Sequence, residues 1–170
     1  GLLPLVRQAD PSASKVALLR ASTGEFPKAV CSGVAEAADN LGFSIVLTTD
    51  FPASTKRFTD VLRELKAVQP DVVVVVGRIQ DDFDLARQLA ESGINAGTVV
   101  AVAAGIQGFQ DNLGSLAERF VGPSQWEADA HYEPDFGPTA EQVVASLQRD
   151  GHSNVDYPMA QAYAAGVVVQ

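Results

Sequence analysis

The sequence predicts an α/β fold in which a doubly wound parallel sheet of about five strands carries helices on both faces. First, apolar stretches of strand length alternate with amphipathic stretches of helix length along most of the chain. Second, the five valines from Val72 to Val76 are typical of a strand that is covered on both faces. Third, a chain of 170 residues, 46% of them hydrophobic, is enough to bury the core of one globular domain.

Each predicted element follows from the spacing of its apolar residues and from the residue that ends it. In chain order we predict a strand over 15–20, a helix over 25–40, a strand over 43–49, a helix over 56–68, a strand over 72–76, a helix over 81–92, a strand over 98–103 and a weaker fifth strand over 119–122. Gly42, Pro70 and Gly93 end the three helical stretches.

The character of the sequence changes after residue 122, which divides the chain into three parts. Residues 1–122 form the α/β lobe, and residues 123–138, rich in turn formers and without period, form an extended connection. Residues 139–170 form helices, of which the first opens with a capping box of Thr139 and Gln142 and the second begins near Pro158. The second helix is apolar almost all round, so we expect the chain to be cut from something larger that would enclose it.

Composition excludes several classes of function. A formal net charge of −9 has the wrong sign for nucleic-acid binding, so no nucleic-acid partner is expected. No apolar run approaches the roughly 20 residues that a membrane helix needs. The single cysteine, Cys31, excludes an internal disulfide and a cysteine zinc site, and its alanine-rich helix favours a buried core position. No signal-peptide pattern is present, which fits an intracellular chain or a mature or trimmed one.

The loops after the strands carry the candidate binding residues, because ligands of an open parallel sheet sit beyond the carboxyl ends of its strands. The turn around Thr23 and Gly24 is either an anion-binding loop or a capped helix start. It matches half of a flavodoxin phosphate loop, with Phe26 in place of the last hydroxyl. Trp126 either packs on a ligand or fills a gap between segments.

Catalytic and metal-binding groups are not evident in the sequence. Asp81, Asp82 and Asp84 are better explained as acids at a helix N-terminus than as a metal site, since no histidine lies nearby. His131 and His152 have no spacing to a nucleophile. We therefore expect a protein that is not an enzyme, with no catalytic residue, metal or cofactor.

Beyond these patterns, an ordered set of short motifs resembles a known family. The set comprises Lys15 to Leu19, Gly24 to Val30, Gly33, Ala37-Ala38, Leu41-Gly42-Phe43, Phe58 to Leu65, Lys66 to Val74, Gly122 to Trp126, Pro134 to Pro138 and Tyr157 to Ala165. Together these resemble the second lobe of type I periplasmic solute-binding proteins of the branched-chain amino acid ABC-transporter family. The resemblance implies a flavodoxin-like lobe of a two-lobed receptor that closes on a small ligand and delivers it to a membrane permease. It also implies that residues 139–170 belong to the other lobe.

The resemblance implies where a ligand would touch this chain. Phe26 falls where the family offers an aromatic side chain, and Arg78 falls where a second contact lies, favouring a carboxylate. The loop after the fourth strand, with Ala104 and Gly105, lacks the acid that would bind an α-amino group. The predicted ligand is thus an amino-acid-like molecule or an aromatic or aliphatic carboxylate. The complete predicted set is Phe26, Thr23, Gly24, Arg78, Ile79, Ala104, Gly105 and Trp126.

The predicted function is therefore the solute-binding component of an ABC importer, periplasmic or extracellular and lipid-anchored or secreted in its full-length form. The alternatives are a flavodoxin-like flavin-binding electron-transfer protein and the ligand-sensing domain of a regulator or receptor. The exposed apolar tail, residues 157–170, is expected to pair with another copy of the chain as a homodimer or to take a non-native position.

Overall fold

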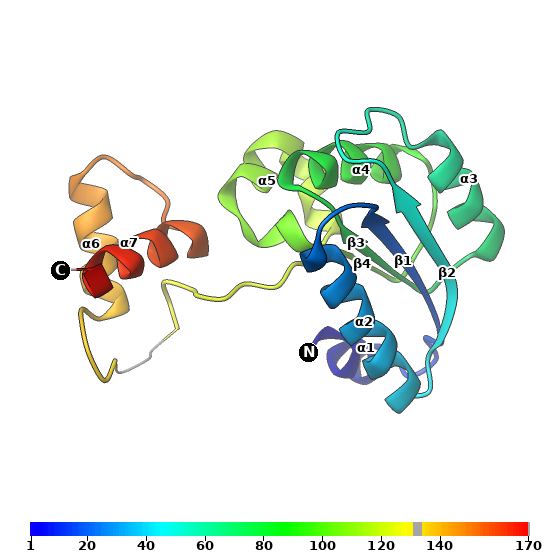
Figure 1. Ribbon diagram of the computed structural model, residues 1–170, viewed down its shortest axis with the longest axis horizontal. Coiled ribbons are helices and arrows are strands. Elements are labelled where there is room, and N and C mark those ends of the chain that lie inside the picture. The colour runs from blue at the N-terminus through cyan, green and yellow to red at the C-terminus, as the bar shows by residue number, and fades with distance from the viewer. Residues whose placement is uncertain (131–133, 170) are drawn as a thin grey trace.

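Four parallel strands in the order β2-β1-β3-β4 form the sheet of the computed structural model, which describes residues 1–130 and 134–169 (Figure 1). The strands are β1 (Lys15–Ala21), β2 (Ser44–Phe51), β3 (Val72–Val76) and β4 (Thr98–Ala101). The predicted parallel α/β fold is confirmed. Residues 131–133, inside the predicted 123–138 connection and including His131, and Gln170, the last residue of the predicted 139–170 helices, lie outside the described residues.

Helices cover both faces of the sheet, so the prediction of a doubly wound arrangement is also confirmed. Helices α1 (Leu2–Ala9) and α2 (Glu25–Asn40) pack on one face, where Val16, Leu18, Val72 and Val74 are buried. Helices α3 (Thr59–Val68), α4 (Ile79–Glu91) and α5 (Gln107–Leu113) pack on the other face, against Ala17, Leu19, Val73 and Val75. All five valines of β3 are buried because successive side chains point to opposite covered faces.

The predicted fifth strand over 119–122 is wrong within the described residues. Only Val121 pairs with the sheet, donating to Val99 O over 2.9 Å and accepting from Ala101 N over 3.0 Å. The pairing stops there because Gly114–Arg119 forms a 3₁₀ helix before it and Pro123, which has no backbone N–H, follows it. The sheet therefore has four strands rather than five.

Several element boundaries differ from the predictions. Strand β4 ends at Ala101 rather than at residue 103, because Val102–Gly105 forms a short 3₁₀ helix, η1. Residues 56–58 precede α3 instead of belonging to it, and α4 begins at Ile79, ahead of the predicted Asp81. Helices α1 and α5 were not predicted. Cys31 is buried, as its sequence context indicates.

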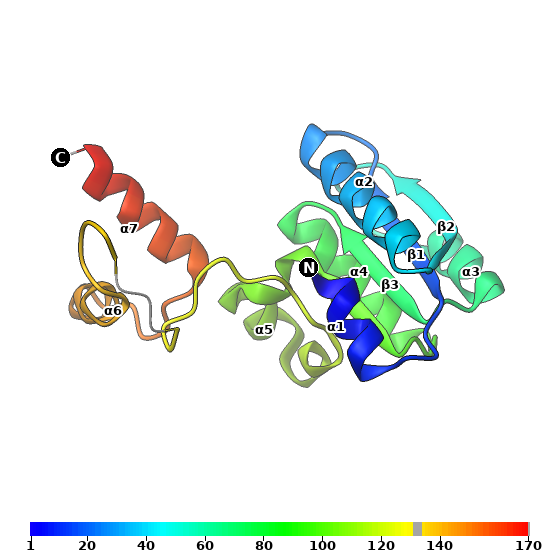
Figure 2. The same cartoon turned by 90° about the horizontal axis from the view of Figure 1, so that it is seen from below.

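The chain after Gly122 leaves the sheet and ends in two helices that stand apart from it (Figures 1 and 2). Helix α6 (Ala140–Arg149) begins with the predicted capping box, in which Thr139 and Gln142 bond reciprocally. Helix α7 (Tyr157–Val169) buries only Ala160 among its described side chains, while Val168 and Val169 are 82% and 87% exposed. Among the residues described, no helix is long and apolar enough to cross a membrane.

Candidate functional site

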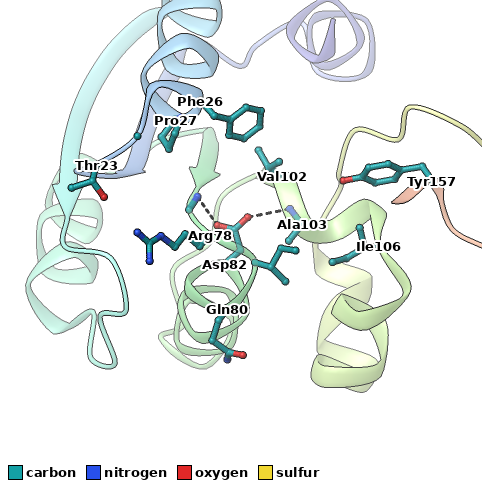
Figure 3. A pocket seen from close by; sticks show the side chains of 13 residues that line it. Thr23, Phe26, Pro27, Arg78, Gln80, Asp82, Val102, Ala103, Ile106 and Tyr157 are labelled. Carbon is teal, nitrogen blue, oxygen red and sulfur yellow. Dashed lines mark hydrogen bonds between the residues drawn. The ribbon is translucent and has the colours of Figure 1, made fainter. Parts of the chain in front are cut away.

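An open cleft of about 810 Å³ lies at the carboxyl edge of the sheet (Figure 3). Its walls come from the turn before α2, the loop between β3 and α4, and η1 after β4. Helix α2 follows β1 on one face, whereas α4 follows β3 on the other, so the connections diverge between these neighbouring strands. A divergence of this kind is where open α/β sheets bind ligands, because the loops on either side leave a crevice.

Five of the predicted residues meet at this cleft: Thr23, Gly24, Phe26, Arg78 and Ile79. Phe26 and Ile79 are 57% and 58% exposed, so each presents a large apolar surface to solvent at the rim. Arg78 occupies the N-cap position of α4 without a capping bond from its side chain and, in the part of the chain that the structure describes, forms no ion pair. The cleft thus offers apolar contacts and one available cation.

Asp82 lies at the floor of the cleft and is only 1% exposed. Its Oδ1 accepts a hydrogen bond from Gly77 N over 2.6 Å, and its Oδ2 accepts one from Ala103 N over 3.0 Å (Figure 3). Burial raises the pKa of Asp82 to about 7, against the opposing effect of the two amides that favour its ionised form. One side chain therefore joins the loop after β3 to the turn after β4.

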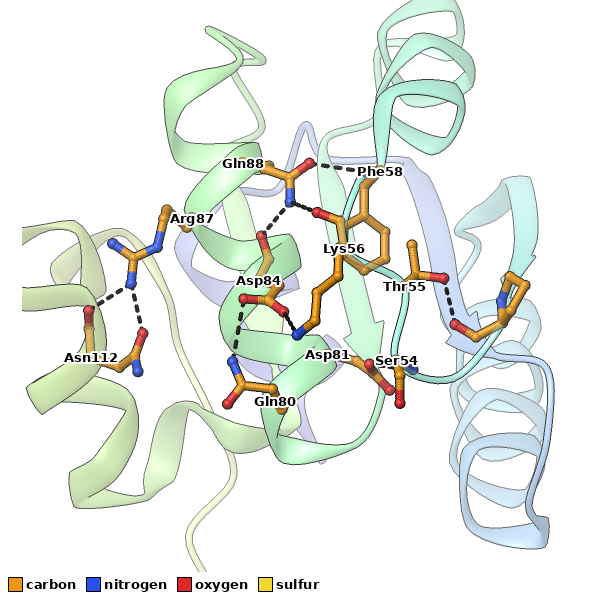
Figure 4. Close-up of polar contacts among 11 residues, drawn as sticks. Ser54, Thr55, Lys56, Phe58, Gln80, Asp81, Asp84, Arg87, Gln88 and Asn112 are labelled. Carbon is orange, nitrogen blue, oxygen red and sulfur yellow. Dashed lines mark hydrogen bonds and ion pairs between the residues drawn. The ribbon is translucent and has the colours of Figure 1, made fainter.

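The loop after β2 is fixed to α4 by a second set of polar contacts (Figure 4). The buried Asp81 accepts from Ser54 N through Oδ1 over 2.8 Å, and its Oδ2 has no hydrogen-bond partner among the described residues. Further along, Gln88 accepts from Phe58 N and donates to Lys56 O. The first turn of α4 thus holds three of the loops at this edge of the sheet.

Tyr157, the first residue of α7, also reaches the cleft, although it belongs to the C-terminal pair of helices. Burial raises the pKa of Tyr157 above its usual 10, with a smaller contribution from Asp156, so the phenol stays a hydrogen-bond donor at neutral pH. Asp156 connects the two parts of the molecule, because its Oδ1 accepts from Met159 N over 3.2 Å and its Oδ2 accepts from Gln107 N over 3.1 Å.

The other three predicted residues, Ala104, Gly105 and Trp126, line a separate cavity of about 490 Å³ beside the chain crossing. Ile106 and Tyr157 line both cavities and so separate them. A Cβ atom at Gly105 would lie 2.4 Å from Pro123 O, which shows how closely the outgoing chain passes over this turn. The ligand-binding role of these three residues stays a prediction.

Sequence reasoning missed Asp82, Ile106 and Tyr157 as cleft residues. Asp82 was interpreted as an acid favoured by the helix dipole, and its local sequence does not distinguish a buried acid from an exposed one. Tyr157 lay before the predicted start of the last helix near Pro158, so nothing directed it toward the sheet.

Comparison with known proteins identifies the class that this fold and cleft define. The family model of the periplasmic binding proteins matches residues 2–169, so the chain belongs to that family. This match and the solved structures below confirm the resemblance drawn from the sequence motifs. No similarity to a curated protein was found.

Solved structures with the same fold are solute-binding proteins. An amino acid ABC transporter substrate-binding protein from Pseudomonas fluorescens is 23% identical, with a TM-score of 0.76 over 94% of this chain and 41% of that one. The leucine-binding protein LivK of Thermotoga maritima is 15% identical, with a TM-score of 0.84 over 98% of this chain and 46% of that one. LivJ of Streptococcus pneumoniae, solved with isoleucine, is 19% identical, with a TM-score of 0.55 over 66% of this chain and 32% of that one. The chain therefore spans less than half the length of each.

Proposed function

We propose that this chain supplies one ligand-binding lobe of the solute-binding component of an ABC importer, together with helices of the other lobe in residues 139–170. The observation that carries the proposal is the cleft at the divergence of β1 and β3, with apolar side chains and a cation at its rim. The family match supports this function over the flavodoxin-like and regulatory alternatives. We expect no catalytic activity, since the family and the solved relatives are named for binding.

The ligand that suits the cleft is a small carboxylate with an apolar or aromatic body. Arg78 can bind a carboxylate through two parallel hydrogen bonds, and Phe26 and Ile79 can cover its apolar part. Both oxygens of Asp82 already accept hydrogen bonds from backbone amides, which leaves this acid poorly placed to bind an α-amino group. The lobe is therefore suited to the carboxylate and side chain of an amino-acid-like ligand.

A matched pair of ligands tests this chemistry. Isoleucine and 3-methylpentanoate, which is the same skeleton without the amino group, would be titrated into the chain and followed by NMR. We expect 3-methylpentanoate to bind at least as tightly as isoleucine, and Arg78→Gln to weaken it while Arg63→Gln, a change in an exposed pair on α3, does not. A clear preference for isoleucine would contradict the assignment. Binding should be weaker than micromolar, because one lobe cannot remove the roughly 70–90% of ligand surface that enclosed sites bury.

The apolar surface of α7 supports a further part of the proposal, that residues 157–170 associate in the isolated chain as a homodimer. Exposed side chains such as Val168 form an apolar surface that association would remove from water. Light scattering on the chain and on Val168→Glu tests this, with Gln161→Glu on the same helix as the control. A monomer in all three samples would contradict the dimer.

In its natural setting we propose that the protein acts outside the inner membrane, in the periplasm or extracellular space, and hands its ligand to a permease. The full-length protein is there either attached to the membrane by a lipid anchor or secreted without one. Metabolic labelling of the full-length protein with radioactive palmitate distinguishes them, since only an anchored form retains the label.

A further inference from the structure

Asp82 contacts two main-chain segments at the floor of the cleft, one through each carboxylate oxygen. The Gly77 amide precedes Arg78, and the Ala103 amide lies in η1, four residues before the start of α5. Because β3 and β4 are neighbours, a carboxylate on the first turn of α4 can reach both segments with its two oxygens.

The approach of Asp82 to the loop after β3 depends on the absence of a side chain at residue 77. A Cβ atom at Gly77 would lie 2.6 Å from Asp82 Oδ1 and 3.0 Å from Asp81 Cβ. The distance from the Gly77 amide nitrogen to Asp82 Oδ1, 2.6 Å, is short for an N–H···O bond. Gly77 and Asp82 are therefore closely packed, and Arg78 follows Gly77 directly in the chain.

We propose that Asp82 is a positioning residue of the ligand site, whose carboxylate couples the Arg78 loop to the Ala103 turn so that the two ligand-facing segments move together. This inference rests on the proposed function for its importance, but the coupling is a property of the chain alone. Gain or loss of a proton on Asp82 changes both hydrogen bonds at once, because a neutral carboxyl group gives up the charge assistance to both amides.

The surroundings of Asp82 allow its ionisation to be followed without interference from many neighbours. The charged and titratable groups around it are Asp81, beside it on α4, Arg78 at the start of the same helix, and Tyr157, which lines the cleft from α7. In Figure 3 the Arg78 side chain extends away from Asp82, toward Thr23. Phe51 and Ala103, from the elements packed nearby, present an aromatic ring and a backbone amide. The shifted pKa of Asp82, about 7, puts the change within an accessible range.

The experiment records ¹H–¹⁵N NMR spectra of the full chain between pH 5 and pH 9. We expect the amide signals of Gly77 and Ala103 to move with a single common midpoint. Asp82→Asn, which turns one acceptor oxygen into a donor group, should abolish both titrations. The control is Asp84→Asn, which removes a half-buried acid on the same helix that pairs with Lys56, and it should leave both titrations intact. Far-UV circular dichroism establishes that each variant is folded.

Two results would overturn the proposal: separate midpoints for the Gly77 and Ala103 amides, or titrations that persist in folded Asp82→Asn. The wild-type titration decides the first point without any variant. Binding of 3-methylpentanoate is measured in the same samples, and we expect its Kd to rise about tenfold in Asp82→Asn. Common titration of the two amides with no binding of any carboxylate would uphold the coupling and refute the proposed function, so the two failures are distinguishable.

Discussion

The backbone amide of Gly77 lies 2.6 Å from Oδ1 of Asp82, in a contact that leaves no room for a Cβ atom on residue 77. Gly77 does not need a glycine-only backbone conformation, since its φ is not in the left-handed region. Residue 77 must be small because Asp82 and Asp81 lie against it. This distinction makes the pair easy to test by substitution.

Gly77→Ala should lower the free energy of unfolding by about 1–3 kcal/mol, because the added methyl group must displace a buried carboxylate. The control is Gly33→Ala in α2, where the new methyl group would meet no atom within 4 Å beyond its chain neighbours and the helix's own backbone, and a helix interior gains about 1 kcal/mol from alanine. Urea unfolding of the two variants measures both effects. A Gly77→Ala variant as stable as the wild type would show that the Asp82 contact is easily displaced.

The burial of Asp82 makes stability depend on pH in a direction opposite to that of most acids. Its folded-state pKa of about 7 lies above its ordinary 3.8, so the folded state holds a proton that the unfolded state has lost between these values. Its contribution to the free energy of unfolding is therefore fully present below about pH 4 and is lost as the pH rises through 7. Relative to that of the wild type, the free energy of unfolding of Asp82→Asn should therefore rise by about 2–3 kcal/mol between pH 5 and pH 8.

Urea unfolding of wild type and Asp82→Asn at both pH values measures that difference. Taking the difference removes the contributions of other acids, such as Asp71, whose pKa is lowered by hydrogen bonds from the Ser14 and Lys15 amides. A difference that stays constant, or that falls as the pH rises, would contradict the raised pKa of Asp82.

Gly105→Ala should loosen the crossing between the lobe and the C-terminal helices. The new methyl group would lie 2.4 Å from Pro123 O, a backbone atom that cannot rotate aside, so the outgoing chain must shift. We expect faster hydrogen exchange at the Ala101 and Val121 amides, which hold this chain to β4. Gly166→Ala in α7 has open space around it and should leave these rates unchanged.

Thr139→Ala should destabilise α6 locally by about 1 kcal/mol, because the capping box loses the hydroxyl that accepts from Gln142 N. Faster hydrogen exchange in the first turn of α6, with the sheet amides unaffected, is the expected result. Ser32→Ala, at an exposed position on α2, is the control. Unchanged exchange in α6 would show that packing against α7 rather than the cap holds that turn.

Local patterns in the sequence were sufficient to predict most of the sheet. Five successive valines fit a strand buried on both faces, and Thr139 with Gln142 fits a helix start, because each feature depends on neighbours in sequence. The prediction of a fifth strand was wrong because the 3₁₀ helix before Val121 and Pro123 after it limit the pairing to one residue. Helix α1 was missed at a terminus where the apolar period is short.

The site was less predictable, since it depends on contacts between distant parts of the chain. Strand-end topology was enough to bring Phe26 and Arg78 to one cleft. The inward position of Asp82 was not predictable, because a buried acid and an exposed one at a helix start have the same local sequence. Tyr157 reaches the cleft only through the path of residues 122–156.

The two hydrogen bonds accepted by Asp156 attach the start of α7 to the start of α5. One oxygen is bound to α7 and the other to the first residue of α5, so a rotation of α7 about this point would move its two ends very unequally. The 13 residues of α7 span about 18 Å along the helix axis, so a tilt of α7 by about 20° at Asp156 would displace Val169 by roughly 6 Å. Tyr157, next to Asp156, would stay at the edge of the cleft during such a tilt.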